Sequence, residues 1–118
     1  MTDFPVTVFH NPACGVSRNV LAMVEAAGYR PEVVDYLKTG WDAAQLRSLF
    51  EEAGLTPRQA LREKEAAAVA PELLEADDET LLAAMIEHPA LVQRPIVRTP
   101  KGAALCRPPE AVRGLLES

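Results

Sequence analysis

The sequence of 118 residues has little cysteine and no long apolar run, and each shortage excludes a class of protein. Two cysteines, Cys14 and Cys106, are too few for the disulfide framework of a small secreted domain. No apolar run approaches the roughly 20 residues that span a membrane. The first residues lack the basic and apolar segments of a signal peptide, so we expect a cytoplasmic protein.

Hydrophobic residues make up 48% of the chain, a share typical of folded globular domains. A chain of this length buries about two thirds of its unfolded surface, which is enough for a core without cross-links. We therefore expect a single folded domain over residues 1–118.

Charge is distributed unevenly along the chain. Acidic residues outnumber basic ones by 17 to 12, which argues against non-specific nucleic-acid binding. Residues 63–87 have a net charge of −7, which we interpret as a solvated surface, whereas residues 88–118 have a net charge of +3. A small anion would find its positive counterpart in this last stretch, or near Arg18 and Arg62.

Hydrophobic spacing in the first third of the chain predicts a strand, a helix and a second strand. Residues 6–9 are rich in β-formers, and the chain breaks at Asn11-Pro12. Apolar residues recur at helical spacing from near Ser17 to a stop at Gly28. Residues 32–37 then have the composition of a strand. Two strands joined by a helical crossover run parallel.

Caps and prolines predict three helices in the middle of the chain, over residues 42–54, 56–62 and 77–88. Strands over 96–99 and 103–106 flank a tight turn, and Pro108-Pro109 opens a last amphipathic helix. The predicted fold class is α/β, with one mixed sheet, flanking helices and a helical insertion in the middle.

Cys14 lies between the first strand and the first helix, where the chemistry of a thiol changes. A sulfur at a helix N-terminus faces unpaired N–H groups and the positive end of the helix dipole, which favour the thiolate. A fall of two units from a pKa of ~8.5 raises the thiolate fraction at pH 7 from about 3% to roughly three quarters. A free cysteine is most often a small buried hydrophobe, but this setting favours a nucleophile.

The neighbours of Cys14 suggest an anion site. Gly15 lets a ligand approach the backbone closely, Ser17 and Asn19 can donate to an oxyanion, and Arg18 adds positive charge. Two interpretations of His10 stay open: it supports the thiolate as an imidazolium, or it merely ends the strand.

The segment HNPACGVSRN, residues 10–19, resembles the active-site loop of the glutaredoxin-coupled arsenate reductases, a thioredoxin-fold family. The similarity covers nearly the whole chain, because it continues through four more motifs: Arg58–Arg62, His88–Pro89, Arg94–Val97 and Leu105–Pro108. It implies that Cys14 attacks arsenate while Arg62, Arg94 and Arg107 bind the oxyanion. By the same resemblance, His10, Asn11, Gly15, Ser17 and Arg18 form the supporting loop, and the peptide bond before Pro95 is cis. Guanidinium forks suit arsenate because it is shaped like phosphate.

The resemblance also implies a reaction with glutathione as co-substrate, glutaredoxin as partner and no tightly bound cofactor. The Cys14 thiolate displaces water from As(V), glutathione attacks, arsenite leaves, and glutaredoxin reduces the mixed disulfide. Ser17 occupies the second position of a Cys-x-x-Ser pair, so an external thiol is required. Cys106 is the alternative resolving thiol, although its strand position indicates packing.

Four alternatives are weighed against this function. Phosphatase-like enzymes need Cys-x5-Arg, whereas Arg18 follows Cys14 after three residues. The two Cys and two His, at scattered positions, lack metal-ligand spacing, so no metal is expected. A thiol-dependent reductase of another substrate and a redox-responsive regulator that binds RNA polymerase share the fold; such regulators typically carry Cys-x-x-Cys, where this chain has Ser17.

Overall fold

The computed structural model describes residues 4–116, which divide into two compact units. The first unit contains residues 4–36 and 94–116, and the second contains residues 37–93. The helical insertion predicted from the sequence corresponds to the second unit.

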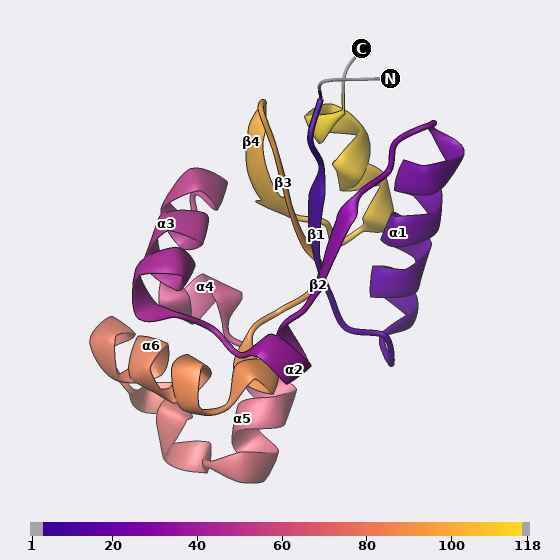
Figure 1. Cartoon of the computed structure of the whole chain (residues 1–118). Helices are drawn as coiled ribbons and strands as arrows, with labels where there is room; N and C mark the ends of the chain where they lie inside the picture. Colours follow the sequence, from indigo (N-terminus) through magenta and orange to yellow (C-terminus); the bar gives the residue numbers. More distant parts are fainter. Residues whose placement is uncertain (1–3, 117–118) are drawn as a thin grey trace. The chain divides into compact units, whose positions relative to one another are not determined.

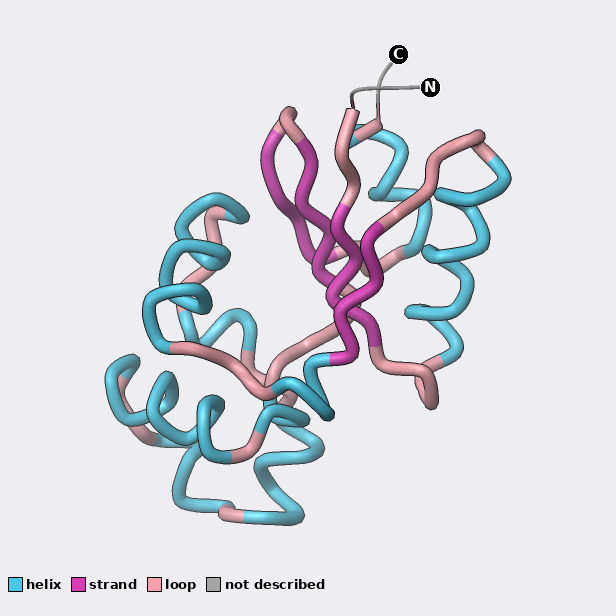
Figure 2. Tube along the Cα trace, viewed as in Figure 1, coloured by secondary structure: helices cyan, strands magenta, loops and turns pink. Residues whose placement is uncertain are grey.

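The first unit is built on a four-stranded mixed sheet with the strand order β2-β1-β3-β4 (Figures 1 and 2). Its strands are β1 (Thr7–His10), β2 (Glu32–Asp35), β3 (Ile96–Thr99) and β4 (Gly102–Leu105). β1 pairs in parallel with β2 and antiparallel with β3, and β3 pairs antiparallel with β4. The predicted crossover and hairpin are therefore both confirmed.

Two helical segments complete the core of this unit: α1 (Gly15–Ala26) and the 3-10 helix η3 (Pro109–Leu115). They pack against each other and against the sheet (Figure 1). The core cluster combines residues of the strands, α1 and the C-terminal segment: Val6, Val8, Val20, Val24, Val97, Cys106, Val112, Leu115 and Leu116. Apolar burial of this kind, at about 25 cal/mol per Å², is the main force that holds α1 to the sheet.

Strands β1 and β4 are each shifted by one residue from the predicted ranges, and three further differences have a clear physical reason. The second strand ends at Asp35, not at residue 37, because its partner β1 ends at His10, the residue paired with Asp35. The chain then turns into α2 (Tyr36–Thr39). α1 begins two residues before Ser17, since apolar spacing only detects the first buried turn. The last helix is a 3-10 helix, with i→i+3 bonds such as Ala111 N–H to the Pro108 carbonyl.

The second unit is helical, as the caps in the sequence predict. Its elements include α3 (Ala43–Ala53), α4 (Pro57–Ala60), α5 (Glu63–Val69), η1 (Pro71–Glu75), α6 (Asp78–Glu87) and η2 (Pro89–Leu91). The Asp42 carboxylate accepts the Gln45 N–H at the start of α3, which ends at Gly54 with φ of 68°. Thr56 and Gln59 form a reciprocal capping box on α4.

Helices α5 and η1 were not predicted. Each contains a single buried residue, Ala66 and Leu73 respectively, so neither shows an apolar period. Their acidic side chains are largely exposed, in agreement with the interpretation of this stretch as solvated surface. Among residues 4–116, no helix combines the length and hydropathy needed to span a bilayer.

Candidate active site

Local hydrogen bonds turn the chain sharply between β1 and α1. The Asn11 side chain accepts the Ala13 N–H at 2.9 Å, and the Cys14 N–H donates to the Asn11 carbonyl at 3.0 Å. Cys14 has extended backbone angles and is the N-cap residue of α1. The short Asx-type turn thus places the thiol at the first turn of the helix, as the sequence predicts.

The Cys14 sulfur is surrounded by donors. The Cys14 residue is 9% exposed, and Nη1 of Arg107 lies 3.8 Å from Sγ. Burial raises the pKa of Cys14. Hydrogen bonds from the Ser17 backbone N–H, Arg94 and Arg107, together with the charge of Arg94, lower the pKa by more than burial raises it. The net result is a pKa of about 7, below the ordinary value of 9.0. At pH 7 about half of the thiol is ionised at such a pKa. This is the ionisation state required of a nucleophilic cysteine.

Arg94 and Arg107 are coupled through the main chain. Nη1 of Arg107 also donates to the Arg94 carbonyl, at 2.9 Å. Arg94 is 8% exposed, and its Nε has no hydrogen-bond partner within residues 4–116. A buried donor without a partner costs free energy, so this guanidinium suits an oxyanion acceptor. The peptide bonds Arg94–Pro95 and Arg107–Pro108 are both cis; the resemblance implies the first but not the second.

His10 contacts Ser17 within the loop. Its Nδ1 lies 2.7 Å from the Ser17 Oγ, which also accepts the Asn11 N–H at 3.0 Å. Burial lowers the pKa of His10, against the opposing charge of Asp35, and Arg18 lowers it further. The structure therefore favours a neutral imidazole over the imidazolium. His10 also does more than end the strand, because its side chain contacts Ser17 in the loop.

The Ser17 hydroxyl differs from the expectation that it donates to an oxyanion. Ser17 is 0% exposed and its Oγ is occupied by His10 and Asn11. The residue acts on the sulfur of Cys14 through its backbone N–H instead. The physical reason is the helix itself: the N–H groups of its first turn point at the N-cap residue, while the Ser17 side chain belongs to the buried face.

The remaining loop residues are exposed. Arg18 is held by a bond from its Nη1 to the Pro12 carbonyl at 2.8 Å. A Cβ built on Gly15 would meet only Arg18 Nη2, at an ordinary 3.8 Å, so the chain leaves this stretch of backbone accessible. Asn19 is exposed on α1. These positions are compatible with the approach of a ligand to the loop.

Arg62 belongs to the second unit, whereas the other predicted site residues belong to the first. It is the half-buried N-cap residue of α5, and its N–H donates to the Leu91 carbonyl at 2.7 Å. Its role toward the thiol stays a prediction.

Cys106 lies in the apolar core of the first unit. It is 0% exposed, its Sγ is 3.7 Å from the Ala104 carbonyl, and burial raises its pKa to about 12. A thiol with this pKa is protonated at pH 7 and is a poor resolving nucleophile. The packing interpretation of Cys106 is therefore favoured.

One functional group could not be found from the sequence: the Arg94 carbonyl, which orients Arg107. No side-chain pattern reveals a main-chain acceptor. Among the described residues 4–116, no group of three or more His, Cys, Asp or Glu side chains could hold a metal ion.

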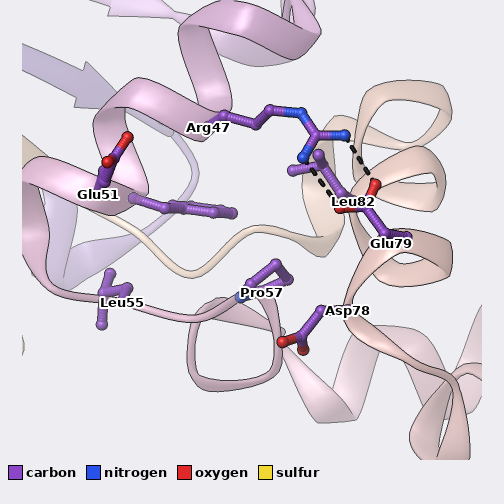
Figure 3. Close-up of a pocket in the computed structure, with 8 residues that line it drawn as sticks. Arg47, Glu51, Leu55, Pro57, Asp78, Glu79 and Leu82 are labelled. Carbon is purple, nitrogen blue, oxygen red and sulfur yellow. Dashed lines mark hydrogen bonds and ion pairs between the residues drawn. The ribbon is translucent and has the colours of Figure 1, made fainter.

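The second unit has its own pocket, of about 340 Å³, between α3, α4 and α6 (Figure 3). Phe50 and Leu82 contribute apolar surface, and Arg47 forms a bidentate ion pair with Glu79, at 2.9 and 2.7 Å, on its rim. None of the predicted site residues lines it. The thiol of the first unit is therefore the stronger candidate site.

A mixed four-stranded sheet with flanking helices and a thiol at the start of the first helix defines a thioredoxin-like protein. A sequence profile of the ArsC family matches residues 9–115, and the chain belongs to this family. Arsenate reductase ArsI1 of Synechocystis sp. is 53% identical over 119 residues, covering 99% of this chain and 83% of that relative. An arsenate reductase of Rhizobium meliloti is 50% identical over 113 residues, covering 94% and 81%. The structure of an arsenate reductase from Vibrio cholerae matches with a TM-score of 0.89 at 38% identity, covering 98% of this chain and 100% of that one.

Proposed function

We propose that this protein is an arsenate reductase, an oxidoreductase that converts arsenate to arsenite with the Cys14 thiolate as nucleophile. The observation that carries the proposal is the environment of the thiol: a pKa of about 7, with two guanidinium groups beside the sulfur. The relatives named above as arsenate reductases, which match nearly the whole chain, support the choice of substrate.

Arsenate and a thiolate are both anions, so their approach requires positive charge. Arg107 and Arg94 supply it, and the buried Arg94 Nε is a donor that an arsenate oxygen would satisfy. Arg62 is proposed as the third arginine. We propose that residues 1–118 act as one arsenate reductase-type domain.

The first chemical step forms a bond between the Cys14 sulfur and arsenic and breaks an arsenic–oxygen bond. The oxygen leaves as water once it is protonated, and arsenic stays As(V). The donors that favour the thiolate then face the remaining oxygens of the thiol ester. The neutral His10 and buried Ser17 act by holding the loop.

The second step requires glutathione. Its thiolate attacks the Cys14 sulfur, and the electron pair of the sulfur–arsenic bond stays on arsenic, which leaves as arsenite, As(III). The two sulfurs have then supplied two electrons and form a mixed disulfide. A glutaredoxin thiol attacks the glutathione sulfur and releases the Cys14 thiolate. We propose the cytoplasm as the site of this reaction, since thiols are kept reduced there.

A coupled assay tests the proposal. Purified protein is mixed with glutathione, glutaredoxin, glutathione reductase and NADPH, and arsenate is added. Arsenate-dependent NADPH consumption with release of arsenite is expected. A parallel assay replaces the glutathione system with thioredoxin and thioredoxin reductase, and a lower rate is expected there. The absence of arsenate-dependent turnover with either donor system would refute the proposal, and RNA polymerase capture would then favour the regulator.

A further inference from the structure

Two segments of the second unit are joined by an isolated antiparallel bridge between Leu61 and Val92. The Arg62 N–H donates to the Leu91 carbonyl at 2.7 Å, and the Gln93 N–H donates to the Ala60 carbonyl at 2.8 Å. These two bonds flank the bridge on either side. They join the segment that contains Arg62 to the segment that ends at Gln93, the residue immediately before Arg94.

The Gln93 side chain adds a third bond across the same bridge. Its Nε2 donates to the Leu61 carbonyl at 3.4 Å. Leu61 and Val92 are a non-hydrogen-bonded antiparallel pair, so the bridge does not use the Leu61 carbonyl. This carbonyl can therefore accept the hydrogen bond from the Gln93 side chain. Gln93 thus bonds both residues that precede Arg62 in the chain, one through its main chain and one through its amide.

The elements on either side of Arg62 cannot fix its position unaided. α4 has four residues and α5 has seven, and helices this short are marginal in water without tertiary contacts. Arg62 is the N-cap of α5 and makes no side-chain capping bond there. The bridge therefore fixes the main chain at Arg62 against residues 91–93 of the same unit.

We propose that Gln93 is a positioning residue that holds Arg62 for arsenate binding. The inference rests on the proposed function and on Arg62 acting as a substrate arginine. The apolar part of the bridge does not depend on the amide, because Leu61 and Val92 are 2% and 0% exposed. A variant without the amide should therefore fold, with Arg62 less firmly held.

The test uses Gln93→Met, which keeps the length of the side chain and removes its donor. In the coupled assay the KM for arsenate should rise about 2–10-fold, the range expected for one hydrogen bond, while kcat changes less. Gln45→Met, on α3 of the same unit, is the matched control and should leave both constants within about twofold of wild type.

A double-mutant cycle distinguishes positioning from a general structural effect. In an Arg62→Ala background the Gln93→Met change should no longer raise KM, because the residue it positions is gone. Equal effects in the two backgrounds, or a KM no different from the control, would overturn the inference. Hydrogen exchange of the Arg62 amide should also become faster in Gln93→Met, while α3 amides stay unchanged; an unaltered Arg62 amide would contradict the tether. If wild type shows no arsenate turnover, the proposed function fails instead, and this exchange result still decides whether Gln93 holds Arg62.

Discussion

Cys14 and Cys106 belong to the same unit and are both buried, with exposed fractions of 9% and 0%, yet their pKa values are about 7 and about 12. Burial raises the pKa of both thiols. Only Cys14 has compensating donors: the Ser17 N–H and the guanidinium groups of Arg94 and Arg107. The chemistry of a buried thiol is therefore decided by the donors around its sulfur.

The two thiols differ in pKa because the backbone leaves unpaired N–H groups beside Cys14, at the start of α1. Cys14 is the N-cap residue of α1, whose first N–H groups have no partner in the helix. Cys106 follows β4, and its N–H is used by the Pro95 carbonyl, while its sulfur packs among apolar residues of the core. One thiol is set up for reaction and the other for packing.

Serine substitutions should separate the two thiols most sharply. Cys14→Ser should abolish arsenate reduction, because the hydroxyl is not ionised at pH 7, whereas Cys106→Ser should keep most of the wild-type kcat. The second variant should instead lose roughly 1–3 kcal/mol of unfolding free energy, from a polar group buried in the core. Turnover by Cys14→Ser in the coupled assay would contradict the assigned roles.

Removing the Arg107 guanidinium should bring the pKa of Cys14 closer to the raised pKa of Cys106. In Arg107→Ala the pKa of Cys14, measured by thiolate absorbance, should rise toward the ordinary range. The loss of a charge-assisted bond, of about 1.5–3 kcal/mol, should lower kcat/KM roughly 10–100-fold. Arg113→Ala, an exposed arginine on η3, is the control and should match wild type. A Cys14 pKa unchanged in Arg107→Ala would show that this arginine does not stabilise the thiolate.

Ser17→Ala tests whether the hydroxyl supports the loop without acting on the sulfur. It leaves His10 and the Asn11 N–H without their shared partner, so unfolding free energy should fall by about 1–3 kcal/mol. The pKa of Cys14 should change little, because the Ser17 backbone N–H remains. Ser48→Ala on the exposed face of α3 is the control, measured by urea denaturation. A large rise in the Cys14 pKa would assign the hydroxyl a direct role.

The pH dependence of stability should have opposite signs for the two thiols. The folded state lowers the Cys14 pKa from 9.0 to about 7, so between pH 7 and 9 the unfolded state binds more protons and stability increases with pH. The folded state raises the Cys106 pKa from 9.0 to about 12, so its contribution falls as pH rises above 9. Wild type and Cys14→Ser, compared by denaturation from pH 7 to 9, should diverge as pH increases. Parallel curves would mean that the thiolate is not favoured by folding.

Most of the fold could be predicted because local physics decided it. The Asp42 cap and the Gly54 stop act within a few residues, and both are confirmed. The prediction was wrong or incomplete for segments whose secondary structure depends on residues distant in the chain. The residues after Asp35 turn into α2 because β1 ends opposite them, and α5 shows no apolar period because it buries only Ala66.

The sequence by itself determined that a cysteine would stand at a helix N-terminus, because the Asn11-Pro12 break and the apolar period of α1 are local signals. It also determined the ArsC family, through motifs spread along the chain. Only the tertiary structure decided which donors meet the sulfur. Arg107 lies 93 residues from Cys14 in the chain, and the pairing of β1 with β3 and β3 with β4 brings them together. Likewise, the inward turn of the Ser17 hydroxyl and the use of the Arg94 carbonyl follow from packing and main-chain geometry, which residue types alone do not encode.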